Sequence, residues 1–502
     1  MPIHATFATP RHWLRRLGAA SCAPFLLVAC TAQALSPPPQ LWPEPQPDVS
    51  SAPLPRQYAP LLTLPTFKAP SASHCARPIQ TREIPGNPVQ NQHSGMRLER
   101  ESAAGYASSS KRAKSEKGAA ADAMAAAAPA LMAEASMPPA SPPAPSTPPQ
   151  RQPAPMQKPR TGPVTAGMVD DNADFNEYLA FRERTQVQHR PRDIRERHLL
   201  VVRDPQGRGV ADAEVLVRSA QGHAMWARTD TQGRVWIHPN AFDPAQAQVY
   251  DVLVRKGGHE AQGFLRRGQK SALELNLSTP TSRGQARLDL VFLIDATGSM
   301  ADEIDKLKAS LQSIAREVAQ LPSKPDLCFG LVAYRDKGDQ FLLRSHDFTN
   351  DLNAFQGVLN ALRAGGGGDY PEAMSEALHE TVHQLNWRGD GATRMVLLLA
   401  DAPPHLDYGG PQYDDDMLAA LGKGIKVFSV GASGLDKQGE FIQRQIAQYT
   451  GGRFVFLTYE DAKRPGSGPG RETVHDVSNY SVQTLDRLIV RLVRDELAPL
   501  QP

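Results

Sequence analysis

Oxygen-bearing side chains stand at alternate positions in a short segment that follows a strongly apolar run. The segment contains Asp295, Thr297 and Ser299, and the run before it, 288–294, predicts a strand that is buried on both faces. An extended turn can direct three such side chains at one ion, and oxygen donors are the ligands that hard divalent cations bind. A second apolar run, 395–399, leads to Asp401, whose carboxylate therefore belongs at the same edge of the sheet.

The elements that must position these residues alternate along the C-terminal half of the chain. Strand patterns and helix patterns follow one another, which predicts a doubly wound, mostly parallel α/β sheet of the Rossmann-like type. After the strand at 288–294, strands are expected near 327–334, 395–399, 426–430 and 453–457, and helices near 300–319, 351–363, 371–385, 441–449 and 481–497.

A glycine-rich loop, 365–368, lies between the two acidic strand ends and is followed by Asp369 and a proline that suits the first turn of a helix. The loop is not a phosphate-binding Walker loop, because no Gly-Lys-Ser/Thr follows it. The segment at Asp295 also lacks the second aspartate expected of an aspartyl-phosphate hydrolase, which disfavours phosphoryl transfer.

The D-x-T-G-S segment, the glycine loop and the strand-end aspartate together resemble the metal-ion-dependent adhesion site of von Willebrand factor type A domains. The resemblance covers residues 286–498. The strings DATGSM, YRD, DFT, GGGGDYPE and ADAPPH are similar to the versions found in hemicentins and in alpha-kinases that carry this domain. The resemblance implies a non-enzymatic binding domain that holds Mg²⁺, with Mn²⁺ or Ca²⁺ as alternatives.

The resemblance also implies a role for each ligand. Thr297, Ser299 and Asp369 would contact the metal directly or nearly so, and Asp295 and Asp401 would hold it directly or through water. Asp369 stands where adhesive members commonly have threonine. Three carboxylates around one divalent ion leave a formal charge of about −1. We therefore expect strong unaided metal binding and a preference for neutral or basic partners.

Residues near the expected site could form a rim that selects the partner. His405, Asp407 and Tyr370 are the candidates for this rim. The acidic run 414–416 could border it as well, although an ordinary solvated acidic loop is the stronger interpretation.

The segment His379-Glu380-Thr381-Val382-His383 matches the H-E-x-x-H signature of zinc proteases. Helical periodicity places both histidines, with Glu372 and Glu376, on the solvent face of the expected helix. A protease is therefore disfavoured, whereas an adventitious surface metal site stays open.

The N-terminus reads as an export signal, because arginines precede an apolar run, 17–29, that is too short to span a bilayer. Residues 27–30 resemble a bacterial lipobox, so residues 1–30 would form the signal and Cys30 would become a lipid-modified N-terminus. The alternative is ordinary cleavage after Ala34, which would release a soluble product.

Residues 31–165 are rich in proline and alanine and predict a disordered tether. Residues 166–198 predict a helical linker whose helix has the acidic segment 170–174 at its N-terminus. Cys75 falls in the tether and Cys328 in a buried strand, so a disulfide between them is not expected, and Cys328 is interpreted as a small core residue.

Residues 199–278 show short strands separated by turns, which predicts a small all-β sandwich. The segments 204–207, 213–215 and 229–233 resemble those of carboxypeptidase regulatory-like modules. Such a module would be a spacer or binding scaffold and implies no chemistry by itself.

The net charge of +2 disfavours a dedicated nucleic-acid binder. The favoured function is an exported protein of the cell envelope, an outer-membrane or periplasmic lipoprotein or else a secreted protein. It would bind a protein or matrix partner through the metal-dependent face and the membrane through a lipid on Cys30. The alternatives are a metal-dependent hydrolase or peptidase and a structural spacer without metal.

Overall fold

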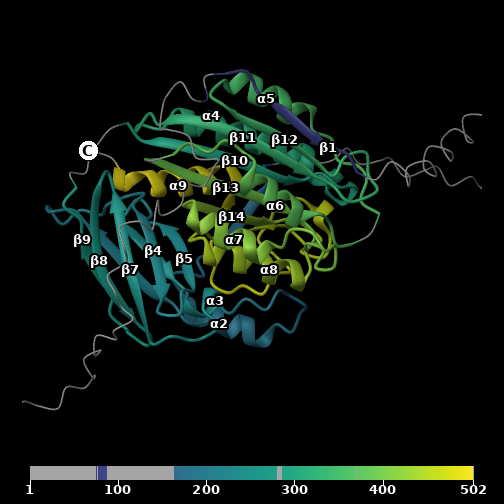
Figure 1. The fold of residues 1–502 in the computed structure, drawn as a ribbon. Coiled ribbons are helices and arrows are strands. Elements are labelled where there is room, and N and C mark those ends of the chain that lie inside the picture. Colours follow the sequence, from purple (N-terminus) through teal and green to yellow (C-terminus); the bar gives the residue numbers. More distant parts are fainter. Residues whose placement is uncertain are drawn as a thin grey trace, which may run out of the picture. The chain divides into compact units, whose positions relative to one another are not determined.

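A mixed β-sheet forms the centre of the structure (Figure 1). The computed structural model describes residues 75, 77–86, 163–279, 285–368, 370–389 and 391–500. The strand order is β1-β12-β11-β10-β13-β14-β15-β2-β16, and the strands from β11 to β15 in this order run parallel. In chain order the strands are β1 Thr81–Ile84, β2 Thr165–Val169, β10 Arg287–Asp295, β11 Asp326–Tyr334, β12 Leu343–Thr349, β13 Ala392–Ala400, β14 Ile425–Gly431, β15 Phe454–Thr458 and β16 Gln483–Thr484.

Helices cover both faces of this sheet, and each face has its own apolar core. One face packs against α4 (Ala301–Ala319), α5 (Leu352–Ala361) and α9 (Leu485–Leu497). The other packs against α6 (Met374–His383), α7 (Tyr413–Gly422) and α8 (Lys437–Tyr449). Short 3-10 helices occur at Gly298–Met300, Pro465–Ser467 and Ala498–Leu500.

The doubly wound α/β fold predicted from the sequence is confirmed. Strand β10 is buried along nearly its whole length, as a strand covered on both faces requires. Several elements, β12 and α7 among them, were not predicted. Strand β12 has a polar sequence, Leu-Arg-Ser-His-Asp-Phe-Thr, and helix α7 opens with three aspartates that resembled a loop.

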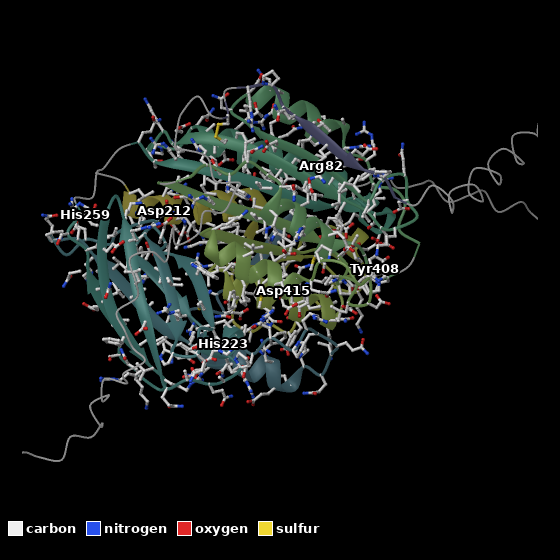
Figure 2. The ribbon with its side chains drawn as sticks, in the orientation of Figure 1. Arg82, Asp212, His223, His259, Tyr408 and Asp415 are labelled. Atoms are coloured by element: carbon white, nitrogen blue, oxygen red, sulfur yellow. A yellow bond between two sulfur atoms is a disulfide. The ribbon has the colours of Figure 1, made fainter. Side chains whose placement is uncertain are left out.

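Residues 77–86 add an edge strand to the sheet, which differs from the expectation of a tether over this segment. Strand β1 pairs antiparallel with β12, and Arg82 (Figure 2) forms an ion pair of 3.0 Å with Glu380 of α6. Arg77 likewise contacts the Asp347 carboxylate at 2.7 Å. A strand of four residues within a proline-rich region leaves no periodic signal.

The expectation that Cys75 and Cys328 stay unpaired was wrong. They form a disulfide with a Cα–Cα distance of 6.0 Å, and both residues are fully buried. The cause is the β1–β12 pairing. Because β12 lies beside β11, the segment at β1 brings Cys75 over the strand that holds Cys328.

The expected helical linker is integrated into the main fold. Strand β2 pairs with β15 inside the large sheet. Helix α2 (Phe175–Arg184) follows, and the Asp174 side chain caps it by accepting a hydrogen bond from the Glu177 backbone N–H. The buried rings of Tyr178 and Phe181 dock this helix on the core that includes Phe441 of α8.

Residues 198–276 form two small sheets with the orders β6-β3-β9 and β5-β4-β7-β8. Their elements are β3 His198–Arg203, β4 Glu214–Ser219, β5 Ala224–Arg228, β6 Arg234–Ile237, α3 Pro239–Phe242, β7 Val249–Lys256, β8 His259–Arg266 and β9 Leu273–Asn276.

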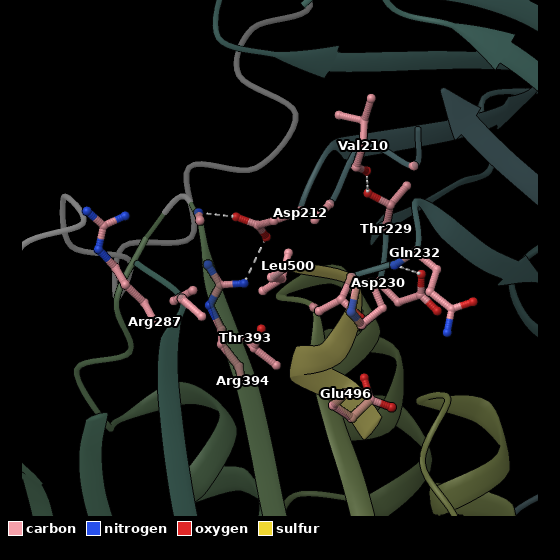
Figure 3. A pocket seen from close by; sticks show the side chains of 18 of the residues that line it. Val210, Asp212, Thr229, Asp230, Gln232, Arg287, Thr393, Arg394, Glu496 and Leu500 are labelled. Atoms are coloured by element: carbon pink, nitrogen blue, oxygen red, sulfur yellow. Dashed lines mark hydrogen bonds and ion pairs between the residues drawn. The ribbon is translucent and has the colours of Figure 1, made fainter. Parts of the chain in front are cut away.

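Charged residues join these small sheets to the large one. Asp212 accepts hydrogen bonds from the Arg394 guanidinium at 2.9 Å and from the Gly391 N–H at 2.6 Å (Figure 3). These residues line a cavity of about 700 Å³, and Asp230 and Glu496 line it as well. The buried ion pair fixes the loop before β4 against strand β13.

Within the described residues no helix combines the length and apolarity that a membrane span would need. The signal at 1–30, the lipid-modified Cys30 and most of the expected tether lie outside the described residues.

Candidate metal centre

The expected metal ligands meet at the carboxyl end of the central strands. Asp295 is the last residue of β10, and Asp401 directly follows β13. The chain continues from β10 to β11 on one side, whereas β13 lies on the other side of β10. Such a reversal of strand order leaves a crevice at the strand ends, where ligands of open α/β sheets bind.

Hydrogen bonds hold the first three ligands in one cluster. Asp295 Oδ1 accepts from the Thr297 backbone N–H at 3.0 Å and from the Thr297 hydroxyl at 2.7 Å. The Thr297 and Ser299 hydroxyl oxygens lie 3.0 Å apart. Asp295 and Thr297 are fully buried, whereas Ser299 is exposed. The cluster therefore reaches the surface on the Ser299 side.

The glycine loop packs directly against this cluster. The Gly298 N–H donates to the Gly366 carbonyl at 2.9 Å, and the Gly367 N–H donates to Asp339 Oδ2 at 2.8 Å. Gly366 and Gly367 have φ values of +79° and +71°. A Cβ at Gly366 would lie 2.3 Å from the Asp339 carboxylate, so the close approach requires glycine. The next ligand in the sequence prediction, Asp369, lies outside the described residues.

Three carboxylate oxygens at this site are buried and have no hydrogen-bond partner within the described part of the chain. They are Asp295 Oδ2, Asp401 Oδ1 and Glu372 Oε2. Buried charged oxygens are costly unless a donor or a cation satisfies them. An all-oxygen set of carboxylates and hydroxyls is also what Mg²⁺, Mn²⁺ or Ca²⁺ binds. The residues present therefore fit a hard divalent cation.

The electrostatics of the site indicate the same need for positive charge. Burial raises the pKa of Asp295, and the nearby Asp401 carboxylate raises it further. Burial also raises the pKa of Asp401, although a hydrogen bond from Ser299 counteracts part of this effect. The pKa of Glu372 rises to about 9 through burial and then through the charge of Asp295. A bound cation would relieve this crowding of carboxylates.

Sequence reasoning missed Glu372 and Asp339. It assigned Glu372 to the solvent face of the helix that contains the two histidines, but α6 begins only at Met374. Glu372 instead lies in an extended segment, where its N–H donates to the Pro403 carbonyl beside Asp401. Its side chain is therefore buried beside Thr297, and helical periodicity does not apply to it. The acidic loop at 336–339, after β11, was the available signal for Asp339.

The proposed rim residues differ in exposure. Asp407 is exposed, and Tyr370 is about half exposed with its hydroxyl 3.0 Å from the Asp436 N–H. His405 is buried beneath the surface, where its ring stacks on Tyr408 at a centroid distance of 3.6 Å. Tyr408, at the edge of the molecule in Figure 2, donates to Asp336 at 2.7 Å.

The H-E-x-x-H residues do not assemble a protease site. His379 and His383 are partly exposed on α6, but Glu380 is buried on another face of the helix. Glu380 Oε1 accepts from the Ser345 hydroxyl at 2.7 Å and Glu380 Oε2 from Arg82 at 3.0 Å. A protease of this type needs that glutamate beside the metal as a general base, and here it is engaged elsewhere.

The family model described as "von Willebrand factor A domain" matches residues 289–404, which contain all five expected ligands. The chain contains a von Willebrand factor A domain. The A domain resemblance read from D-x-T-G-S, the glycine loop and Asp401 is thus confirmed.

Relatives of the A domain belong to diverse proteins. The chain is 30% identical over 142 residues to the alpha-protein kinase vwkA of Dictyostelium discoideum, covering 27% of this chain and 22% of that protein. It is 24% identical over 199 residues to human integrin beta-4, covering 35% of this chain and 11% of that protein. The chain thus spans about a fifth or less of the length of these relatives.

Among solved structures, the PilB minor pilin of Streptococcus sanguinis aligns with 59% of this chain and 94% of its own. The sequence identity is 13% and the TM-score is 0.28. The pilus adhesin SpaC of Lactobacillus rhamnosus GG aligns with 41% of this chain and 31% of its own, at 16% identity and a TM-score of 0.25.

Proposed function

We propose that this chain is an exported binding protein whose A domain holds a divalent cation and, through that face, a protein or matrix partner. The observation that carries the proposal is the set of buried carboxylate oxygens at the ends of β10 and β13 that have no hydrogen-bond partner among the described residues. These oxygens lie in the A domain of this chain, and the relatives of that domain include an integrin subunit. The proposed role is binding and assembly rather than catalysis.

The ligands would come from three segments. Asp295, Thr297 and Ser299 follow β10, Asp401 follows β13, and Asp369 belongs to the glycine loop. Mg²⁺ is the expected ion, with Mn²⁺ or Ca²⁺ as alternatives. The cation would supply a Lewis-acid position for an oxygen ligand of the partner.

The charge of the site bears on the choice of partner. Glu372 adds a carboxylate beside Asp295 and Asp401 that the sequence prediction did not include. If Asp369 is also a ligand, as the sequence predicts, four carboxylates would serve one divalent cation, and the formal local charge would be about −2 if all were ionised. A site of this kind favours neutral or basic partner groups over carboxylates. The exposed Asp407 and Tyr370 would form the rim around it.

The disulfide supports export. Cys75–Cys328 is buried, and structural disulfides persist in oxidising compartments such as the periplasm and the extracellular space. We therefore infer an envelope location, as an outer-membrane or periplasmic lipoprotein anchored through Cys30, or else secretion. Mass spectrometry of the mature N-terminus from the native host distinguishes lipid-modified Cys30 from cleavage after Ala34.

Isothermal titration calorimetry with MgCl2 tests the metal site. Asp401→Asn and Glu372→Gln should each weaken Mg²⁺ binding tenfold or more, which corresponds to about 1.4 kcal/mol. Glu274→Gln is the control, because it removes an exposed carboxylate on β9 of the small sheets and should leave the affinity unchanged. Equal Mg²⁺ affinity in wild type and Asp401→Asn would overturn the proposal.

Partner binding is tested with the immobilised full chain exposed to envelope and matrix fractions. Binding should require Mg²⁺, be lost with EDTA, and be lost in Asp401→Asn. Added NaCl at constant Mg²⁺ should weaken it if the partner group is basic. Capture that persists in both EDTA and Asp401→Asn would show that the partner does not use the metal face.

A further inference from the structure

A second cluster of metal-ligating side chains lies between α6 and α7, apart from the strand-end site. His379 and His383 are one turn apart on α6, and Asp416 faces them from the first turn of α7. Asp416 Oδ1 lies 3.0 Å from His379 Nδ1 and 2.9 Å from His383 Nε2. The three ligand atoms all fall within 4.8 Å of one another. One ion could therefore contact all three.

The aspartate of this cluster is buried and incompletely satisfied. Its side chain is 4% exposed, and its second oxygen, Oδ2, has no hydrogen-bond partner among the described residues. A buried carboxylate normally engages both oxygens. The two imidazole rings also stack with a centroid distance of 4.4 Å. Both rings thus direct one nitrogen at a single carboxylate oxygen, so three donor atoms converge on one point.

The donor types specify the class of ion. Two imidazole nitrogens and one carboxylate oxygen suit Zn²⁺ and similar transition metals, whereas Mg²⁺ and Ca²⁺ prefer oxygen alone. The histidine side chains are 41% and 30% exposed, so the cluster is accessible from solvent. Water or an outside ligand can fill the remaining positions. Near this cluster, the ammonium group of Lys423 donates a hydrogen bond to the Val382 carbonyl at 2.6 Å.

We propose that His379, His383 and Asp416 form a second metal site, which binds a divalent cation of the zinc class and fastens α7 to α6. The role is structural, because Glu380 points away to Ser345 and Arg82. Helix α6 follows the segment with Glu372, and α7 follows the segment with Asp401. A metal that links the two helices therefore restrains two segments that border the strand-end site.

Calorimetry with ZnCl2 tests the proposal on the full chain without a polyhistidine tag, first stripped of metal and then held in excess MgCl2. One equivalent of Zn²⁺ should bind. His383→Gln and Asp416→Asn should each weaken this binding at least tenfold. The matched control is His259→Gln, an exposed histidine on β8 (Figure 2), which should bind Zn²⁺ as wild type does.

Two further measurements separate this site from loss of fold and from the strand-end site. Co²⁺ in place of Zn²⁺ should give visible absorption bands that disappear in His379→Gln, while far-UV circular dichroism stays unchanged. Asp401→Asn should keep its Zn²⁺ binding even where Mg²⁺ binding is lost. No stoichiometric Zn²⁺ binding, or binding that is equal in wild type, His383→Gln and Asp416→Asn, would overturn the proposal.

Discussion

Removing the Cys75–Cys328 disulfide should cost the folded protein a large part of its stability. The bond closes a loop with a sequence separation of 253 residues. In the chain-entropy description, opening such a loop lowers the free energy of the unfolded chain by about 5.5 kcal/mol at 25 °C. Losses on removing native disulfides are generally about 2–5 kcal/mol. We therefore expect Cys75→Ala/Cys328→Ala to lose about 3–5 kcal/mol of unfolding free energy.

Equilibrium urea unfolding, followed by circular dichroism, measures this difference. Wild type with reductant should match the double variant, and reductant should have no effect on the variant. The ion pairs of Arg77 and Arg82 are present in both proteins, so the comparison isolates the covalent link. Unfolding free energies that agree within about 1 kcal/mol would contradict this expectation. Reaction of both Cys75 and Cys328 with a thiol reagent, in wild type made in an oxidising compartment, would contradict it as well.

Three further predictions concern buried groups. Arg388→Met should destabilise the fold by about 3–5 kcal/mol, since it leaves the buried Asp289 carboxylate without its 2.6 Å partner; chemical denaturation measures the loss. His238 is fully buried, and burial lowers its pKa from 6.5 to about 3, so the unfolded chain binds a proton first as the pH falls. The contribution of His238 to the unfolding free energy is complete above about pH 6.5 and declines by about 1.4 kcal/mol per pH unit towards pH 3. Denaturation across this pH range should show a shallower decline of the unfolding free energy in His238→Phe than in wild type. Gly367→Ala should destabilise the fold by about 1–3 kcal/mol and weaken Mg²⁺ binding, because φ is +71° and the new Cβ would lie 2.7 Å from Glu372 Oε1; denaturation and calorimetry measure the two effects.

Each of these predictions has a control. The double change Asp289→Leu/Arg388→Met should recover part of the loss, and an equal or greater loss would contradict the buried-charge argument. For His238, an unchanged pH profile in the variant would mean that His238 is not the group that takes up a proton on unfolding. His346, whose pKa burial lowers to about 4, should sustain part of the profile. Gly357→Ala is the control for Gly367, since it lies in α5 with open space around it and should be neutral or slightly stabilising. Equal effects of the two alanines would refute the steric argument.

The fold could be predicted where the sequence is strongly periodic. Helix α4 buries Ile304, Leu307, Leu311, Ile314 and Val318 on one face, as their spacing indicates, and β10 is buried as its apolar run requires. Strand β1 could not be predicted, because its pairing with β12 depends on a contact more than 250 residues away in the sequence. Helix α7 was missed because its aspartates contact tertiary partners that the sequence does not reveal, with Arg192 on Asp414 and the two histidines on one oxygen of Asp416.

The site was predictable to the extent that its ligands share a local motif. Asp295, Thr297 and Ser299 follow one strand in a recognisable order, and the rule on strand ends placed Asp401 beside them. Glu372 was assigned to the wrong environment, because its placement depends on where α6 begins. His405 was assigned to the rim, although it packs beneath it on Tyr408, since exposure in a loop cannot be read from residue type.

The position of the disulfide determines how the protein carries mechanical load if its N-terminus is anchored. Tension that enters from the N-terminal side reaches Cys75 and crosses the sulfur–sulfur bond into β11. Strand β11 lies beside β10, which ends at Asp295, so the load passes almost directly from the anchor to the proposed partner face. The two small sheets, residues 198–276, lie outside this load path. They would stay unstretched while the A domain holds its partner under tension.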